Sequence, residues 1–134
     1  MEEEKVAIAT ISDEIYKTEL KVRNHTLIAD EPADVGGKDL GPRPGDFYRM
    51  SLASCTAITL RMYANRKKFD VKEIQVMVTT EEGEGKTILH TSIKIKGNLD
   101  EAQHTRMLQI AKLCPVHKML TNPIEIETSL SVVS

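Results

Sequence analysis

The stretch from Pro44 to Lys68 reads PGDFYRMSLASCTAITLRMYANRKK, and it decides the fold. Pro44 suits the first turn of a helix, where its missing N–H costs nothing. Arg66 and Lys67 suit the negative end of the helix dipole. Small or apolar side chains lie on most sides of the cylinder, which predicts a long helix buried on most sides. A monomer of 134 residues offers little cover for such a helix, so we expect a second copy to bury it.

The segments on either side of this helix are rich in β-forming residues. Before it, three short strands are expected at 5–11, 15–22 and 25–30, followed by a loop over 30–45 that holds three of the five prolines. After it, alternating apolar residues at 73–78 and 89–95 predict a hairpin that turns at EEGEGK, with one face open to water.

Two further helices and a last strand are expected after the hairpin. Asp100 is a suitable N-cap for a helix through about Leu113. Its inward residues are expected to be Met107, Leu108, Ile110 and Ala111. The sequence CPVHKML then begins a short third helix, and residues 124–132 alternate as a final strand. The order βββ-α-ββ-α-α-β predicts an α+β fold with an antiparallel sheet, in one domain over residues 1–134.

Composition excludes several classes of function. The formal charge is -2, and the 18 Lys and Arg residues are scattered among 20 acidic ones, which argues against a nucleic-acid-binding surface. No apolar run approaches the roughly 20 residues that a membrane span needs. The acidic start of the chain is unlike a secretory signal, so we expect a cytoplasmic protein. In a reducing compartment, two cysteines are expected to be free, metal-bound or catalytic rather than a permanent disulfide.

Cys114 and Cys55 carry the most distinctive chemistry of the sequence. Cys114 precedes Pro115 and therefore falls at a helix N-cap, where free N–H groups stabilise a thiolate. A capping cysteine can equally be structural, and Cys55, on a buried helix, can equally be a small apolar packing residue. Two thiols that meet would allow a cycle in which a sulfenic acid on one condenses with the other. Spacing alone does not show that they meet.

A metal site is the less favoured alternative. Cys55, Cys114 and His117 offer three ligands and Asp46 a fourth, but Cys114-x-x-His117 is the only close pair. The remaining histidines belong to no recognisable nucleophile motif, and VGGKDLGP lacks the context of a phosphate-binding loop. We expect no metal and no bound cofactor.

Two segments together resemble a known family. DEPADVGGKDLGPRPGDFYRMSLASCTAITLRMYANRK resembles the central segment of the OsmC-like family, named for osmotically inducible protein C, which includes the organic hydroperoxide resistance proteins. AKLCPVHK is similar to the segment around the second cysteine of that family. The chain looks closest to a less characterised branch.

The resemblance implies a fold, an assembly and an activity. The family fold is an α+β homodimer of intertwined subunits, with long helices between antiparallel sheets. It implies active sites at the dimer interface, where Cys55 would be the peroxidatic residue and Cys114 the resolving one. An organic hydroperoxide would be the substrate, and a small or lipoyl-linked dithiol would reduce the disulfide.

One part of the family pattern is missing. Hydroperoxide-reducing members carry a glutamate ten residues before the first cysteine, where this chain has Gly45 with Asp46 beside it. They also hold the thiolate with an arginine, for which Arg23, Arg43 and Arg49 are all candidates. An arginine lowers a thiol pKa and a carboxylate fixes the arginine. Two rival interpretations therefore stay beside the peroxidase: a dimer that binds a small molecule without catalysis, and a structural dimer with inert thiols.

Overall fold

The computed structural model describes residues 5–134, and the chain forms two compact units that meet between Met50 and Ser51. The long helix α1 (Pro44–Lys67) begins in the first unit and ends in the second. Its bounds match the expected helix closely. Asp46 lies in the first turn and accepts a hydrogen bond from the Arg43 N–H (2.9 Å), which satisfies one of the free donors at the helix start.

The first unit contains a three-stranded antiparallel sheet in the order β1-β2-β3. Its strands are β1 (Ala7–Thr10), β2 (Thr18–Val22) and β3 (His25–Ala29). Leu20 lies opposite Ala9 on one side and Leu27 on the other. The three expected strands are confirmed, although β2 begins at Thr18 rather than Ile15.

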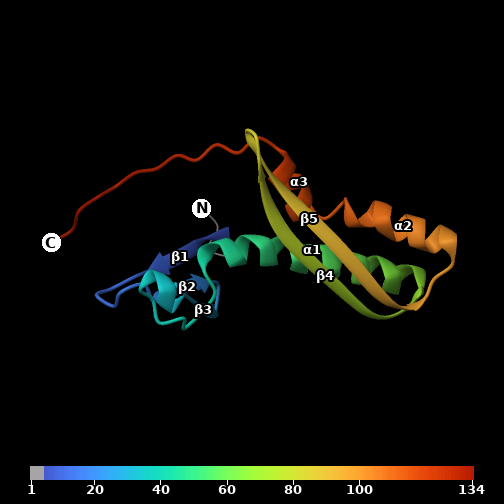
Figure 1. Ribbon diagram of the computed structural model, residues 1–134, viewed down its shortest axis with the longest axis horizontal. Coiled ribbons are helices and arrows are strands. Elements are labelled where there is room, and N and C mark those ends of the chain that lie inside the picture. Colours follow the sequence, from blue (N-terminus) through green and yellow to red (C-terminus); the bar gives the residue numbers. More distant parts are fainter. Residues whose placement is uncertain (1–4) are drawn as a thin grey trace. The chain divides into compact units, whose positions relative to one another are not determined.

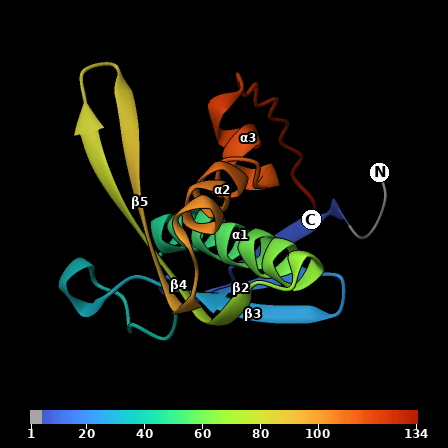
Figure 2. The same cartoon turned by 90° about the vertical axis from the view of Figure 1, so that its right-hand side faces the viewer.

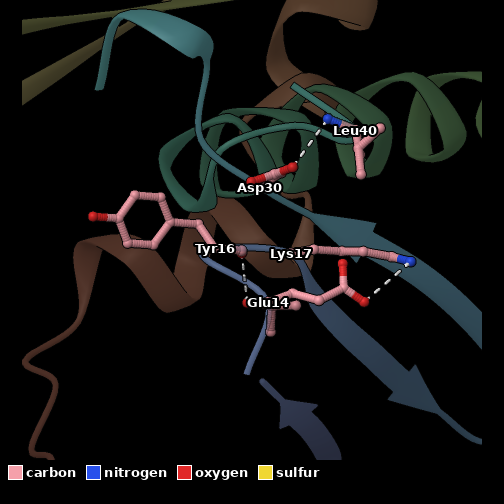
Figure 3. Close-up of polar contacts among 6 residues, drawn as sticks. Glu14, Tyr16, Lys17, Asp30 and Leu40 are labelled. Carbon is pink, nitrogen blue, oxygen red and sulfur yellow. Dashed lines mark hydrogen bonds and ion pairs between the residues drawn. The ribbon is translucent and has the colours of Figure 1, made fainter. Parts of the chain in front are cut away.

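The loop between β3 and α1 is held together by a buried carboxylate. Asp30 is 2% exposed, and its two oxygens accept the N–H groups of Glu31 (2.8 Å) and Leu40 (3.1 Å; Figure 3). The loop also contains the 3-10 helix η2 (Ala33–Val35). Gly41 packs so tightly that a Cβ there would lie 2.1 Å from the Ile28 carbonyl oxygen, which explains the glycine. The loop is therefore a folded element with fixed ends.

The second unit packs a long hairpin and two helices around the C-terminal part of α1 (Figure 1). The hairpin consists of β4 (Asp70–Gly83) and β5 (Lys86–Asn98), and it is followed by α2 (Glu101–Ala111) and α3 (Pro115–Thr121). Figure 2 shows α2 running beside α1. The buried core joins these two helices through Leu60, Tyr63, Ala64, Met107, Ile110 and Ala111.

Polar interactions stabilise the start of α2 and join this helix to α1. Asp100 caps α2 by accepting the Gln103 N–H (2.8 Å), and the Gln103 side chain accepts the Asp100 N–H (3.0 Å). The hydroxyl of Tyr63 on α1 accepts a hydrogen bond from Arg106 Nε on α2 (3.0 Å). The expected cap is confirmed, but the expected inward position of Leu108 is wrong, because its side chain is 53% exposed.

The last expected strand does not form. From Ile124 to Val132 the chain has neither helix nor strand, and it runs as an extended segment after α3 (Figure 1). The apolar side chains of this segment are 61% to 91% exposed: Ile124, Ile126, Leu130 and Val132. A strand needs a hydrogen-bonded neighbour, and within residues 5–134 none pairs with this segment. The α+β class with antiparallel sheets is confirmed by the remaining elements.

None of the helices within the described part of the chain is long and apolar enough to span a bilayer.

Candidate functional site: a hydrogen-bonded pair of thiols

Cys55 lies on α1, between the half-buried Ala53 and Ala57 and next to the buried Thr56. Its own side chain is half-buried. The small neighbours leave the sulfur within reach of another element, as the sequence indicated. The helix therefore presents this thiol rather than enclosing it.

Cys114 lies in the short connection between α2 and α3. It is the N-cap of α3, with Pro115 at the first helical position, and its Sγ accepts the His117 N–H at 3.4 Å. Its side chain is fully buried. The expected capping position of Cys114 is confirmed, and the sulfur replaces the oxygen that a Ser or Asp would bring.

The two thiols are in direct contact. The Cys55 side chain donates a hydrogen bond to the Cys114 sulfur, and the backbone N–H of Val116 contacts both sulfurs. Both cysteines are free, so the structure represents the reduced form of the pair. This contact forms within one chain, because α2 leads the chain back to α1. The resemblance implied that the thiols meet at a dimer interface, but their meeting needs no second chain.

The surroundings shift the pKa values of the two thiols in opposite directions. Burial and the hydrogen bond given to Cys114 raise the pKa of Cys55, and the bonds from Val116 and Thr59 offset only part of that rise. Burial also acts to raise the pKa of Cys114, but the hydrogen bonds from Cys55, His117 and Thr56 outweigh it and lower that pKa.

Two threonines of α1 belong to this site, and the sequence analysis missed both. Thr59 follows Cys55 by four residues, so helical spacing alone could have placed them on one face. Thr56 bonds to Cys114 instead, and no spacing rule could have found that contact, because the two residues are far apart in the chain.

Of the three candidate arginines, Arg49 binds Asp46 through its guanidinium, and Arg43 binds it through its backbone N–H. Arg49 Nη2 donates to Asp46 Oδ1 at 2.5 Å. The backbone N–H of Arg43 and the Arg49 guanidinium lower the pKa of Asp46. Arg23 lies in the turn between β2 and β3 with a positive φ of 54°. Asp46 and Arg49 thus form a carboxylate–guanidinium pair within the first turns of α1.

The candidate metal ligands are not grouped into a site among the described residues. Within residues 5–134, no three His, Cys, Asp or Glu side chains are grouped so that they could hold an ion. His117 contributes its backbone N–H to Cys114, rather than a ligand to a shared metal.

A cavity of about 630 Å³ lies elsewhere in the second unit. Its lining is mixed, because six apolar side chains share it with two carboxylates, a threonine and a histidine. The lining residues are Leu60, Thr91, Ile93, Ile95, Gly97, Leu99, Asp100, Glu101, His104, Met107 and Leu108. Neither cysteine lines it, so this cavity is separate from the thiol pair.

Solved structures share this fold. A candidate osmotic-stress-induced and detoxification-response protein from Psychrobacter arcticus is 24% identical, with 84% of this chain and 85% of that chain covered at a TM-score of 0.71. An OsmC-like protein from Mycoplasma pneumoniae is 18% identical, with coverage of 90% and 89% at a TM-score of 0.72. An organic hydroperoxide resistance protein from Legionella pneumophila is 19% identical, with coverage of 87% and 89% at a TM-score of 0.59.

No curated protein matches the sequence. The model of one protein family, described as OsmC-like protein, matches residues 36–129. That range includes α1, the hairpin, α2, α3 and both cysteines. Since the match covers well over half of the chain, this protein belongs to the OsmC-like family.

Proposed function

We propose that this protein is a thiol-dependent peroxidase that reduces organic hydroperoxides through Cys55 and Cys114. The observation that supports it best is the direct hydrogen bond between a half-buried thiol and a fully buried one in the same chain. Cys55 is the sulfur that a substrate can reach, and Cys114 is close enough to condense with whatever forms on it. Family membership supports the same activity, since fold relatives include organic hydroperoxide resistance proteins.

The chemistry proceeds in two steps. The Cys55 thiolate attacks the distal oxygen of the hydroperoxide, the O–O bond breaks, and a sulfenic acid and an alcohol result. The Cys114 thiolate then attacks the Cys55 sulfur, hydroxide leaves, and a disulfide forms. A small or lipoyl-linked dithiol reduces that disulfide and is itself oxidised to a disulfide. No metal or bound cofactor takes part in these steps.

Asp46 and Arg49 are the proposed counterparts of the family's carboxylate and arginine. Their bonded geometry supports this assignment, because a guanidinium fixed by a carboxylate is well suited to hold an anion. Asp46 lies one residue after the position of the missing glutamate.

The proposed assembly is a homodimer in which a second copy covers the open hairpin edges and the exposed apolar side chains of one chain. The β4–β5 hairpin is a sheet of only two strands, with both outer edges unpaired among the described residues. The hairpin is supported on one side by its packing against the helical core, and a strand from a second copy could extend it at an open edge. The exposed alternating segment at 124–132 has the apolar pattern of such a strand.

Hydroperoxide turnover by single-cysteine variants tests the peroxidase. With cumene hydroperoxide and a dithiol reductant, Cys55→Ser is expected to lose turnover, because it lacks the attacking sulfur. Cys114→Ser is expected to react once and keep a sulfenic acid, which dimedone labels and mass spectrometry detects. Ser54→Ala, which changes an exposed neighbour of Cys55, should retain the parent rate. If both cysteine variants consume hydroperoxide as fast as the parent protein, this function is wrong.

A non-catalytic binding dimer is the second candidate, and the separate cavity in the second unit favours it. Its lining of apolar side chains with a few polar groups suits a small ligand that has an apolar part, and no thiol chemistry is needed there. Native mass spectrometry of the purified protein would reveal a retained small molecule. A retained ligand together with no hydroperoxide consumption supports binding over catalysis. If the cysteines stay unreacted after excess hydroperoxide and no ligand is retained, the protein is better described as a structural dimer with inert thiols.

A further inference from the structure

We infer that three exposed cations around the ring of Tyr63 form a binding site for a phosphoryl group. The cations are Arg66 and Lys67 in the last turn of α1 and Arg106 in the middle of α2. The site goes beyond the proposed peroxidase, because neither cysteine belongs to it. Its ligand is inorganic phosphate or the phosphate ester of a small molecule.

The three charges gather around one aromatic ring. Arg66 Cζ lies 5.3 Å from the centroid of the Tyr63 ring, and Arg106 Cζ lies 5.6 Å from it. Lys67 Nζ lies 5.9 Å from the same centroid. The ring belongs to a buried side chain, whereas all three cations are exposed. The buried ring thus collects three positive charges at one exposed place where α1 and α2 run side by side (Figure 2).

The guanidinium of Arg106 is held in a fixed orientation. Its Nε donates a hydrogen bond to the Tyr63 hydroxyl (3.0 Å), and its Nη1 donates one to Gln109 Oε1 (3.0 Å). A guanidinium carries five N–H donors, so these two bonds leave others for a ligand. Because a held guanidinium loses little freedom on binding, Arg106 is prepared to receive an oxyanion.

No carboxylate neutralises the cluster within residues 5–134. The ion pairs of this part of the chain involve other cations, and none joins Arg66, Lys67 or Arg106 to an acid. Like charges this close together repel one another. The chain as a whole carries a formal charge of -2, so this local excess is not the general property of a basic protein. An anion from outside the chain would relieve the repulsion.

Two ordinary explanations account for only part of the cluster. Cations in the last turn stabilise the negative end of a helix dipole, which explains Arg66 and Lys67. Arg106 lies in the middle of α2, so the dipole does not explain it. Attraction to an aromatic ring favours each cation singly, but it does not remove the repulsion among three of them. The arrangement as a whole is better explained by a shared ligand.

The number of charges selects a phosphoryl group over a carboxylate. A carboxylate carries one negative charge and two oxygens, which suit a single guanidinium. A phosphate ester carries about two negative charges at pH 7 and three acceptor oxygens, so several cations can share it. Arginine binds such a group through its planar fork and lysine as a point charge, and the cluster supplies both.

An NMR titration of the whole chain with sodium pyrophosphate tests the site. Sodium chloride keeps the ionic strength constant, so that screening does not change during the titration. We expect the Nε–H signals of Arg66 and Arg106 to shift and saturate with a dissociation constant of about 1 mM or below. The signal of Arg23, in the turn between β2 and β3, should stay in place. If neither cluster arginine shifts up to about 10 mM pyrophosphate, the inference is wrong.

Two double variants separate the site from the net charge. Arg66→Gln with Lys67→Gln removes two cluster charges and should weaken pyrophosphate binding at least about tenfold. Lys86→Gln with Lys94→Gln removes the same charge from the β4–β5 hairpin and should keep the parent affinity. An equal loss in both double variants would show that only the net charge matters, which overturns the site.

The contribution of α2 has its own variant. Arg106→Gln should also weaken pyrophosphate binding, because it removes the fork that is held by Tyr63 and Gln109. Circular dichroism confirms that each variant keeps its fold. If the folded Arg106→Gln protein binds as tightly as the parent, the two helices do not share a ligand and the proposed site is wrong.

Other anions define the class of ligand. Citrate at the same ionic strength should bind at least about tenfold more weakly than pyrophosphate, and equal binding would overturn the assignment of a phosphoryl group. Phenyl phosphate and inorganic phosphate then distinguish the two sources of that group. Tighter binding of phenyl phosphate supports the ester of a small molecule, and equal binding supports free phosphate.

Discussion

Asp30 shows how much one residue can organise in this protein. Its carboxylate joins the two ends of the loop by accepting the N–H groups of Glu31 and Leu40, and its own N–H donates to the Pro42 carbonyl (3.1 Å). The loop leads directly into α1. A single buried acid therefore fixes the path by which the chain enters its longest helix.

Replacing Asp30 tests this role. Asp30→Ala removes an acceptor that serves two backbone donors and leaves both without a partner, so we expect a loss of about 3 kcal/mol in the free energy of unfolding. Denaturant unfolding measures the loss. Asp30→Asn retains one acceptor oxygen and should lose about half as much. Equal stability of Asp30→Ala and the parent protein would show that the loop does not depend on this carboxylate.

The thiol site was partly predictable at the level of single residues. Pro115 marked a helix start, and that local rule correctly placed Cys114 at its cap. The contact of Cys114 with Cys55 and Thr56 depends on how α2 returns to α1, which no local pattern records. The pairing of Asp46 with Arg49 follows a helical spacing of three, but Arg23 and Arg43 were equally good candidates from the sequence.

At the scale of elements, α2 offers a clear test of local stabilisation. Asp100 and Gln103 exchange hydrogen bonds at the start of this helix, in the reciprocal pattern that satisfies two free donors. Asp100→Ala should reduce the free energy of unfolding by about 1 kcal/mol, measured by chemical denaturation. Asparagine is an equally good cap, so Asp100→Asn should keep the parent stability. A loss of the same size in both variants would contradict the capping role.

Helix ends that depend on neighbouring residues were predicted well from the sequence. Features that depend on contacts with residues far away in the chain were not. The bounds of α1 follow from Pro44 and from the cations near Lys67. Leu108 was expected in the core because it is apolar, yet it faces outward while Met107 beside it is 3% exposed. The strand predicted at 124–132 does not form, for a different reason. Its alternation is real, but a strand forms only when a partner supplies the other half of the hydrogen bonds.

At the scale of the whole molecule, the open apolar surface predicts a dimer. In α1, Ile58 is 54% exposed and Met62 is 67% exposed, which is far from the expected burial on most sides. With the C-terminal segment exposed as well, one chain leaves a large apolar area in water. Sedimentation should therefore give a dimer at micromolar concentration, and a monomer there would contradict the proposed assembly.

The C-terminal segment can be tested within the same experiment. Ile126→Asp with Leu130→Asp places charges on its apolar positions, and we expect at least about a tenfold weaker dimer, because the charges would be buried on pairing. Ser129→Asp changes the alternate face and should leave the association unchanged. If both variants associate as tightly as the parent, the segment takes no part in the interface.

One detail of α3 links the oxidation state of the protein to its backbone. Cys114 holds the first turn of α3 by accepting the His117 N–H through its sulfur. In a disulfide with Cys55 that sulfur must take the position and dihedral angle that the S–S bond requires, which we expect to weaken its hydrogen bond with the His117 N–H. Every oxidation would therefore uncap the helix, and every reduction would restore it. The seven residues of α3 would fray and re-form once in each turnover, a built-in signal that a reducing protein could recognise.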